Sequence, residues 1–208
     1  MNDSLSPNTS TETLPGLLFV LVGPSGVGKN AVIDAVMQRL TYLRRLPTAT
    51  TRPPRPNEQE GREHFFVSMA RFEEMVAEGA FIEHQEVHSG KFYGTVYSVF
   101  YEALRDGTHL IADIDIRGAT AIRAAFPDNF ISIFVLPPSL EVLRTRIVQR
   151  GKMEPAEIAE RLRRAEEEEL PRADECDYRV VNDRLEDCAA EVVDIITAEI
   201  AARAQVRP

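Results

Sequence analysis

The chain has 208 residues, 44% of them apolar, and a formal net charge of −9 at pH 7. This length suits one domain with a sizeable core and mobile subdomains, and no apolar stretch is long enough to span a membrane. The acidic balance argues against bulk attraction to nucleic acid or to an anionic membrane. The two cysteines, Cys176 and Cys188, lack metal-type spacing, so we expect a reduced, cytoplasmic protein.

The first segment, residues 1–16, is rich in Ser, Thr, Asn and Pro and contains no Lys or Arg. This composition predicts a disordered tail and does not fit a signal peptide. The remaining residues, 17–208, are expected to form the folded domain.

A glycine-rich loop follows the apolar run Leu17–Val22 and leads into a helical pattern from Lys29 to Leu40. Strand, glycine-rich loop, Lys and helix in this order indicate a phosphate-binding P-loop. Glycines let successive backbone N–H groups surround phosphate oxygens, and the helix directs its positive end toward the anion. Lys29 adds a mobile positive charge for the transferred phosphoryl group. The nucleotide-binding candidates are Gly23, Pro24, Ser25, Gly26, Val27, Gly28, Lys29 and Asn30.

Asn30 stands where a P-loop normally has Ser or Thr, whose hydroxyl binds Mg²⁺. Its amide oxygen is acceptable to a hard cation. Asn30 could therefore ligate the metal directly, hold a metal-bound water, or do neither.

A proline-punctuated segment covers residues 44–67, where proline at this density excludes helix. Five arginines concentrate positive charge there within an acidic chain: Arg44, Arg45, Arg52, Arg55 and Arg62. The segment is either a solvated loop or a surface that receives a second phosphate.

In the middle of the chain, the pattern of apolar residues and glycines predicts a short helix ended by Gly79, a strand at 81–87, a turn at 90–94 and a helix near 102–105. A buried strand at 110–114 follows. It ends in Asp113 and Asp115, where a parallel sheet places its binding crevice. Asp115 is a second candidate metal ligand.

The last third begins with a buried strand at 131–136, and Ser139 can cap the next helix. Arg146 and Arg150, four residues apart, project from one face of that helix. Pro155 suits the first turn of a second helix, which carries Arg161. A strand at 178–181 and a final helix with an apolar stripe complete the pattern.

These elements predict an α/β fold: a P-loop NTPase-type parallel sheet core flanked by helices, with an inserted lobe and a helical lid. The core is expected at residues 17–46, 98–138 and 172–203, the inserted lobe at 47–97 and the lid at 139–171.

From about Leu17 to Ile200 the chain resembles guanylate kinases, P-loop nucleoside monophosphate kinases. Beyond the P-loop, the resemblance rests on four stretches in a specific order: Thr50-Thr51-Arg52-Pro53-Pro54-Arg55; Phe81-Ile82-Glu83 with Tyr93-Gly94-Thr95; Asp113-Ile114-Asp115 with Gly118; and Pro137-Pro138-Ser139 with Arg146 and Arg150-Gly151. It implies that the inserted lobe binds the acceptor GMP.

The resemblance also implies roles for individual residues. Arg52, Arg55 and Tyr93 would bind the GMP phosphate, Glu83 and Thr95 would read guanine, and Asp113 would lie close to the acceptor. Arg146, Arg150 and Arg161 would reach the ATP phosphates from the lid. Thr48 stands where the family commonly has Ser, and His64 stands where a phosphate-binding Tyr is expected.

The implied reaction is Mg²⁺-dependent transfer of a phosphoryl group from ATP to GMP or dGMP, giving ADP and GDP, by positioning and charge stabilisation as the lid closes. One alternative is a kinase of the same fold that acts on another phosphorylated small molecule. Another is a non-catalytic binding module, which would typically have lost the phosphate-loop and lid groups. We expect a monomer or small homo-oligomer.

Overall fold

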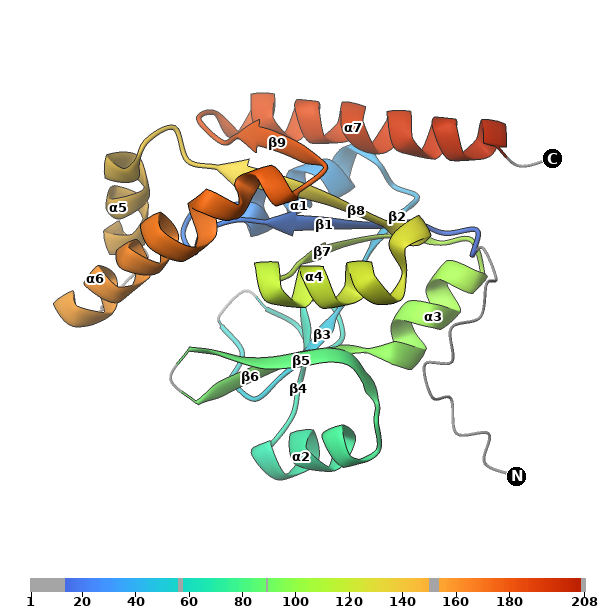
Figure 1. Cartoon of the computed structure of the whole chain (residues 1–208), viewed down its shortest axis with the longest axis horizontal. Helices are drawn as coiled ribbons and strands as arrows, with labels where there is room; N and C mark the ends of the chain where they lie inside the picture. Colours follow the sequence, from blue (N-terminus) through green and yellow to red (C-terminus); the bar gives the residue numbers. More distant parts are fainter. Residues whose placement is uncertain (1–13, 56–57, 89, 150–153, 207–208) are drawn as a thin grey trace. The chain divides into compact units, whose positions relative to one another are not determined.

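The computed structural model describes residues 14–55, 58–88, 90–149 and 154–206. Single strands or short runs of strands are separated by helices along these residues (Figure 1). The chain divides into two compact units. The first unit combines the start of the chain through Leu18 with Arg44–Phe130, and the second combines Phe19–Leu43 with Ile131 to the end of the chain.

The second unit is built on three neighbouring strands in the order β1-β8-β9. Their bounds are β1 Leu18–Val22, β8 Phe130–Leu136 and β9 Tyr178–Val181. β8 and β9 run parallel, with Ile133 opposite Tyr178. All five residues of β1 and six of the seven in β8 are buried, as expected for a parallel sheet covered on both faces. The predicted parallel α/β core is confirmed.

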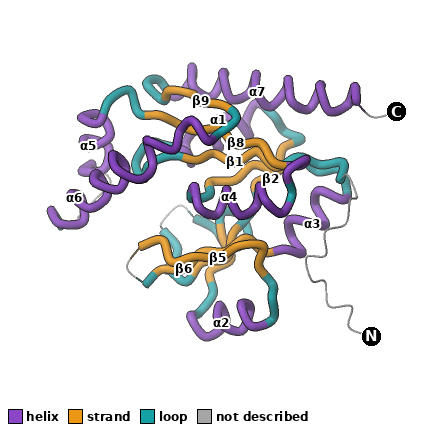
Figure 2. Tube along the Cα trace, viewed as in Figure 1, coloured by secondary structure: helices purple, strands orange, loops and turns teal. Residues whose placement is uncertain are grey.

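Helices of the second unit begin where local chemistry favours them. They are α1 Lys29–Arg39, α5 Leu140–Gln149, α6 Pro155–Arg164 and α7 Leu185–Val206, with a π-helical turn at Ala165–Glu169 and a 3₁₀ turn at Leu170–Glu175. Ser139 Oγ accepts the N–H of Val142 at 3.2 Å, so the predicted cap of α5 is confirmed, as is Pro155 at the first position of α6. α7 packs against α1 through its buried stripe (Figure 2).

The first unit contains a four-stranded sheet in the order β4-β3-β6-β5. Its strands are β3 Thr48–Thr50, β4 His64–Phe66, β5 Phe81–His88 and β6 Lys91–Val96, and β2 Leu43–Arg45 lies beside β7 His109–Asp113. The helices are α2 Met69–Ala77, α3 Tyr97–Arg105 and α4 Ile116–Ala125, with a 3₁₀ turn at Pro127–Asn129. Phe72 of α2 is buried and stacks on Phe81 at 4.8 Å between ring centroids, which fixes the helix on the sheet.

The predicted turn at 90–94 is wrong beyond Gly90. Residues from Lys91 onward form β6, and of the two glycines in the predicted turn Gly90 has a positive φ, of 74°, whereas Gly94 does not. Gly94 is a strand residue opposite Ala49 and His84. A Cβ there would lie 2.7 Å from the ring of Phe81, so this glycine makes room for an aromatic side chain and forms no turn.

The predicted disordered tail, residues 1–16, extends too far, because its last three residues are ordered. Leu14 is buried, and the Asn129 side-chain amide donates to the carbonyls of Leu14 and Gly16 at 2.9 and 2.6 Å. Residues 1–13 lie outside the described part of the chain. The division into core, inserted lobe and lid stays a prediction. Among the described residues no helix is long and apolar enough to cross a membrane.

Candidate active site

The glycine-rich loop joins β1 to α1 in the second unit. Gly23 and Gly28 have φ values of 138° and 105°, which L side chains rarely adopt. A Cβ on Gly23 would lie 2.5 Å from the carbonyl oxygen of Val135 in β8. The loop therefore packs against the end of the sheet with no room for a side chain at this position.

Lys29 is the first residue of α1, and its Nζ donates to the carbonyl of Gly23 at 2.6 Å. The side chain thus folds back over the loop and connects its two ends. Gly28, the N-cap, provides no side-chain acceptor for the first turn of α1. The first turn of α1 is consequently suited to an anion, the arrangement expected of a P-loop. Asn30 follows directly in the first turn of α1.

Two of the three predicted lid arginines lie against the loop. Arg161 of α6 donates to Ser25 Oγ at 2.6 Å and also pairs with Glu157. Arg146 of α5 donates to the backbone carbonyls of Val27, Asn182 and Asp183 at 3.3, 2.8 and 3.3 Å. Arg150 lies outside the described residues.

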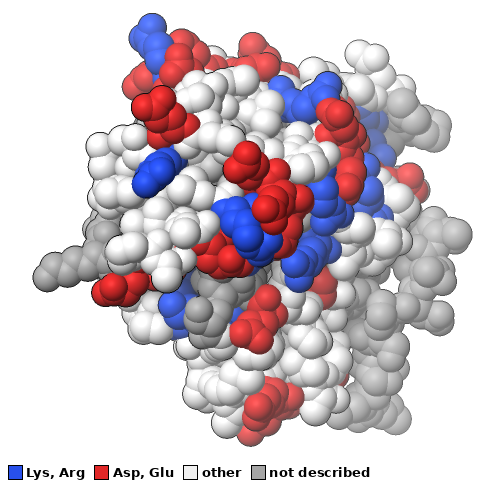
Figure 3. Space-filling model, turned by 60° about the vertical axis from the view of Figure 1, so that its left-hand side comes forward, with Lys and Arg blue, Asp and Glu red and all other residues white. Residues whose placement is uncertain are grey.

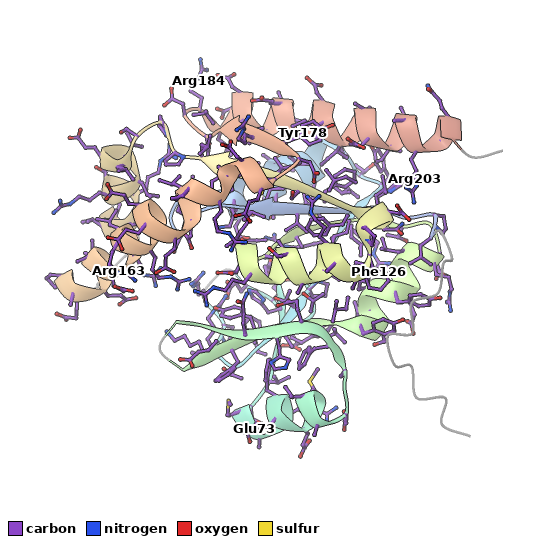
Figure 4. All side chains as sticks on the ribbon, viewed as in Figure 1. Glu73, Phe126, Arg163, Tyr178, Arg184 and Arg203 are labelled. Atoms are coloured by element: carbon purple, nitrogen blue, oxygen red, sulfur yellow. The ribbon has the colours of Figure 1, made fainter. Side chains whose placement is uncertain are left out.

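Another arginine of α6 is paired with neighbouring carboxylates and does not reach the loop. Arg163, which projects from α6 in Figure 4, pairs with Glu160, Glu167 and Glu168. Acidic and basic side chains also alternate on the face drawn in Figure 3. Exposed pairs of this kind contribute little stability. Arg161 differs because its half-buried guanidinium reaches the phosphate loop.

In the first unit, Arg52 is buried at the end of β3, and its guanidinium is almost fully engaged. Nε donates to the Tyr93 hydroxyl at 2.9 Å, and Nη1 donates to the Pro53 carbonyl. Nη1 and Nη2 also donate to the two carboxylate oxygens of Glu58, at 2.5 and 2.7 Å. The backbone N–H of Arg55 also donates to Glu58, at 2.8 Å. The structure thus brings together Arg52, Arg55 and Tyr93, the three predicted ligands of the acceptor phosphate.

Glu58 was missed by sequence reasoning, although it lies three residues after Arg55 in an arginine-rich segment. Burial opposes ionisation of its carboxyl, but the hydrogen bonds from Arg52 and the Arg55 amide outweigh burial and lower the pKa of Glu58 to about 2. Glu58 is therefore a fixed anion at neutral pH, held by the groups predicted to bind phosphate.

His64 and Thr48 are paired residues of the parallel strands β4 and β3. The Thr48 hydroxyl and His64 Nδ1 are 2.8 Å apart, and the His64 ring meets Tyr93 edge-on at 5.7 Å. Burial and the positive charge of Arg52 lower the pKa of His64 to about 4, against the opposing effects of Glu58 and Asp113. His64 is therefore a neutral hydrogen-bonding group at pH 7.

Glu83 and Thr95 face one another across β5 and β6, and Thr95 Oγ1 donates to Glu83 Oε1 at 2.7 Å. Burial raises the pKa of Glu83, and the charge of Asp115 adds to this shift. The carboxylate rests on α4, where a Cβ on Gly118 would lie 2.7 Å from Glu83 Oε2. Donors on a ligand would favour the ionised form of this carboxylate.

The acidic residues after β7 occupy different positions. Asp113 is the last residue of the strand, whereas Asp115 is the N-cap of α4 and accepts the N–H of Arg117 at 2.8 Å. One oxygen of Asp115 thus has a structural partner. Within the described ranges, His, Cys, Asp and Glu form no group of three that could hold a metal ion by themselves. The predicted metal roles of Asn30 and Asp115 stay predictions.

Comparison with known proteins adds independent observations. The family model described as guanylate kinase matches residues 16–199. The chain belongs to the guanylate kinase family. A guanylate kinase from Nostoc sp. is 43% identical over 86% of this chain and 88% of its own length, and one from Thermotoga maritima is 40% identical over 89% and 88%. The crystal structure of guanylate kinase from Anaplasma phagocytophilum matches with a TM-score of 0.71 and 29% identity, covering 91% of this chain and 89% of that one.

The Glu58 contacts generate a pH-dependent stability prediction. Because the folded-state pKa of Glu58 lies below its ordinary value of 4.5, ionised Glu58 stabilises the fold at neutral pH, and this contribution is lost as pH falls from about 4.5 to about 2. We expect Glu58→Gln to cost about 2 kcal/mol at pH 7, or roughly 4–8 °C in Tm. In melting curves of both proteins from pH 7 to pH 2, the difference in Tm should begin to shrink below about pH 4.5 and should close near pH 2.

Glu74→Gln is the matched control, because Glu74 pairs with Arg71 on the exposed surface of α2. Its Tm should stay close to that of the unmodified protein throughout the pH range. A gap for Glu58→Gln that stays constant down to pH 3 would contradict the assignment.

Gly118→Ala tests the part of Glu83 in acceptor binding. Alanine favours the helix by about 1 kcal/mol, but its methyl group would lie 2.7 Å from Glu83 Oε2 and 2.9 Å from Cγ2 of the buried Ile114, so it would displace the carboxylate and overpack the site. We expect a Tm that is unchanged or lowered by a few degrees, together with a KM for GMP raised roughly 10-fold or more and an unchanged KM for ATP. Thr120→Ala, at an exposed position on the same helix, should leave both KM values unchanged. Normal GMP use by Gly118→Ala would remove Glu83 from acceptor recognition.

Proposed function

We propose that this chain transfers the γ-phosphoryl group of ATP to GMP and releases ADP and GDP. The observation that carries this proposal is that one chain of the guanylate kinase family contains two groups of residues suited to holding phosphate. One is the glycine loop with Lys29 and Arg161, and the other is the cluster of Arg52, Arg55 and Tyr93. A kinase whose acceptor already carries a phosphate needs both.

On the donor side, backbone N–H groups of the loop and the start of α1 would hold the phosphates of ATP. Lys29 would exchange its bond to the Gly23 carbonyl for a phosphate oxygen, and Arg161 would release Ser25 for the same purpose. These exchanges place positive charge where negative charge shifts during transfer, which supplies most of the catalysis in phosphoryl transfer. No general base is needed for a phosphate acceptor that is already ionised.

On the acceptor side, guanine presents N1–H and the N2 amino group as adjacent donors. The carboxylate of Glu83, held by Thr95, supports pairing with both. Adenine lacks this pair of donors and would leave a buried carboxylate unsatisfied. Arg52, Arg55, Tyr93, Thr48 and His64 would hold the 5′-phosphate, with Asp113 nearby.

The reaction is proposed to need Mg²⁺, which neutralises phosphate charge when it is bound. Mg²⁺ in kinases takes one or two protein oxygens and otherwise phosphates and water. The chain fits this pattern, because Asn30 carries an amide oxygen in the first turn of α1, directly after Lys29. Asn30 would contact the ion directly or through water. We propose ATP and GMP as the partners and the cytoplasm as the location.

The proposed acceptor is tested with a coupled ADP-release assay over GMP, AMP, CMP and UMP. We expect kcat/KM for GMP to exceed that for AMP by at least about 100-fold, because the site is built around hydrogen bonds to the base. Lys29→Met, expected to fold normally, should lose orders of magnitude in kcat. Equal use of AMP and GMP would refute the guanine assignment, and GMP binding without turnover would indicate a binding module.

A metal titration tests the role of Asn30. The amide oxygen lies one bond further from the backbone than a Ser hydroxyl, so near-octahedral Mg²⁺ fits less readily than Mn²⁺, which tolerates distortion. We expect activity with Mg²⁺, a high relative rate with Mn²⁺, and half-maximal activity at lower Mg²⁺ in Asn30→Ser. Asn30→Leu, which lacks a ligand atom, should require more metal. Superimposable Mg²⁺ curves for Asn30→Leu and the unmodified protein would exclude Asn30 from the metal site.

A further inference from the structure

Asn182, directly after β9, is a buried polar residue that the proposed chemistry does not use. Its side-chain Nδ2 donates to the carbonyl oxygen of Val27, in the phosphate loop, at 2.8 Å. Only the NH₂ end of an amide can face a carbonyl favourably, so the orientation of this side chain is fixed by chemistry. The contact joins residues 155 positions apart in the sequence.

Asn182 is itself held by its backbone. Its N–H donates to the carbonyl of Leu136 at the end of β8, and its carbonyl accepts Arg146 Nη1 at 2.8 Å. The same Arg146 nitrogen reaches the Val27 carbonyl at 3.3 Å. The end of the sheet, α5 and the phosphate loop therefore meet at Asn182, which is only 5% exposed. A side chain anchored in this way is a rigid support for the loop.

The orientation of the Val27 carbonyl determines that of the next N–H. In a planar trans peptide, the carbonyl of one residue and the N–H of the following residue point to opposite sides. With the Val27 carbonyl directed at Asn182, the N–H of Gly28 points away from Asn182, on the other side of the loop backbone. A P-loop binds phosphate through N–H groups of this kind.

The orientation of this peptide must be fixed by a contact, because the backbone of Gly28 can adopt many conformations. Glycine populates positive and negative φ about equally, so the Val27–Gly28 peptide can rotate with little intrinsic cost. Rotation would direct a carbonyl dipole at the phosphates in place of an N–H. The contact is also close, since a Cβ on Gly28 would lie 2.5 Å from Asn182 Nδ2. The absence of a side chain at Gly28 leaves space for the Asn182 amide, and the hydrogen bond from this amide then restricts rotation of the Val27–Gly28 peptide.

We infer that Asn182 is a positioning residue that fixes the Val27–Gly28 peptide so that the Gly28 N–H faces the bound phosphate chain. This inference rests on the proposed function only for its donor, a nucleoside triphosphate, and is independent of the acceptor. The ligand group that the Gly28 N–H would contact is a linear polyphosphate.

The test is calorimetric binding of inorganic tripolyphosphate and of ADP, each with Mg²⁺, to the whole chain without any acceptor. Asn182→Ala removes the donor, and Asn182→Asp keeps the shape but places an acceptor against the Val27 carbonyl. We expect both variants to bind tripolyphosphate and ADP roughly 10- to 100-fold more weakly, with Asn182→Asp the weaker. In turnover assays, KM for ATP should rise while KM for GMP stays unchanged.

Asn129→Ala is the matched control. Asn129 is also a buried asparagine whose amide donates to two backbone carbonyls, those of Leu14 and Gly16, in the first unit. It should lower Tm and leave tripolyphosphate affinity unchanged.

The inference is overturned if Asn182→Ala binds tripolyphosphate normally, whether or not it lowers Tm as Asn129→Ala does. Asn182 would then be merely structural. If Asn182→Asp does not fold, the comparison of the two alanine variants decides alone. Failure of the proposed acceptor appears separately, as absence of GMP preference in the unmodified protein.

Discussion

A cation that is removed from water needs an oxygen partner before its ligand arrives, and each described arginine or lysine predicted to bind phosphate has one. Lys29 bonds a loop carbonyl, Arg161 bonds Ser25 and Glu157, and Arg52 bonds Glu58. Substrate binding is therefore an exchange of oxygen partners in both halves of the proposed chemistry, and its free energy is the difference between two good sets of contacts.

The sequence was informative wherever function depends on order along the chain. The glycine loop after an apolar run, the parallel strands and the cap at Ser139 all follow from local pattern, and the structure has them where they were expected. Partners distant in sequence could not be read in this way. Asn182 is an ordinary polar residue after a strand until the fold places it against Val27, and nothing local distinguishes Gly94, which admits an aromatic ring, from a turn glycine.

Glu83 illustrates how one buried carboxylate can favour a base with two adjacent donors and disfavour a base that offers an acceptor. Burial raises its pKa, so its ionised form is incompletely compensated before a ligand binds. A base that offers two adjacent donors would restore the compensation, whereas one that offers an acceptor would worsen it. Gly118 contributes by leaving space for the carboxylate against α4. Discrimination then depends on the cost of an unsatisfied buried group more than on the strength of a new contact.

The Arg52–Glu58 pair sets a requirement on the acceptor. A guanidinium has five N–H donors, and Arg52 uses four of them, on Tyr93, Pro53 and the two oxygens of Glu58. A ligand must therefore accept from the fifth N–H of Arg52 or displace Glu58, whose pKa of about 2 keeps it ionised. A singly charged carboxylate ligand gains nothing by such displacement, because it replaces an equal charge that is already covalently attached to the protein. A phosphate dianion brings a second charge and a third oxygen, which Arg55 and Tyr93 are placed to meet. The internal carboxylate thus favours acceptors that carry a phosphate, consistent with a nucleoside monophosphate.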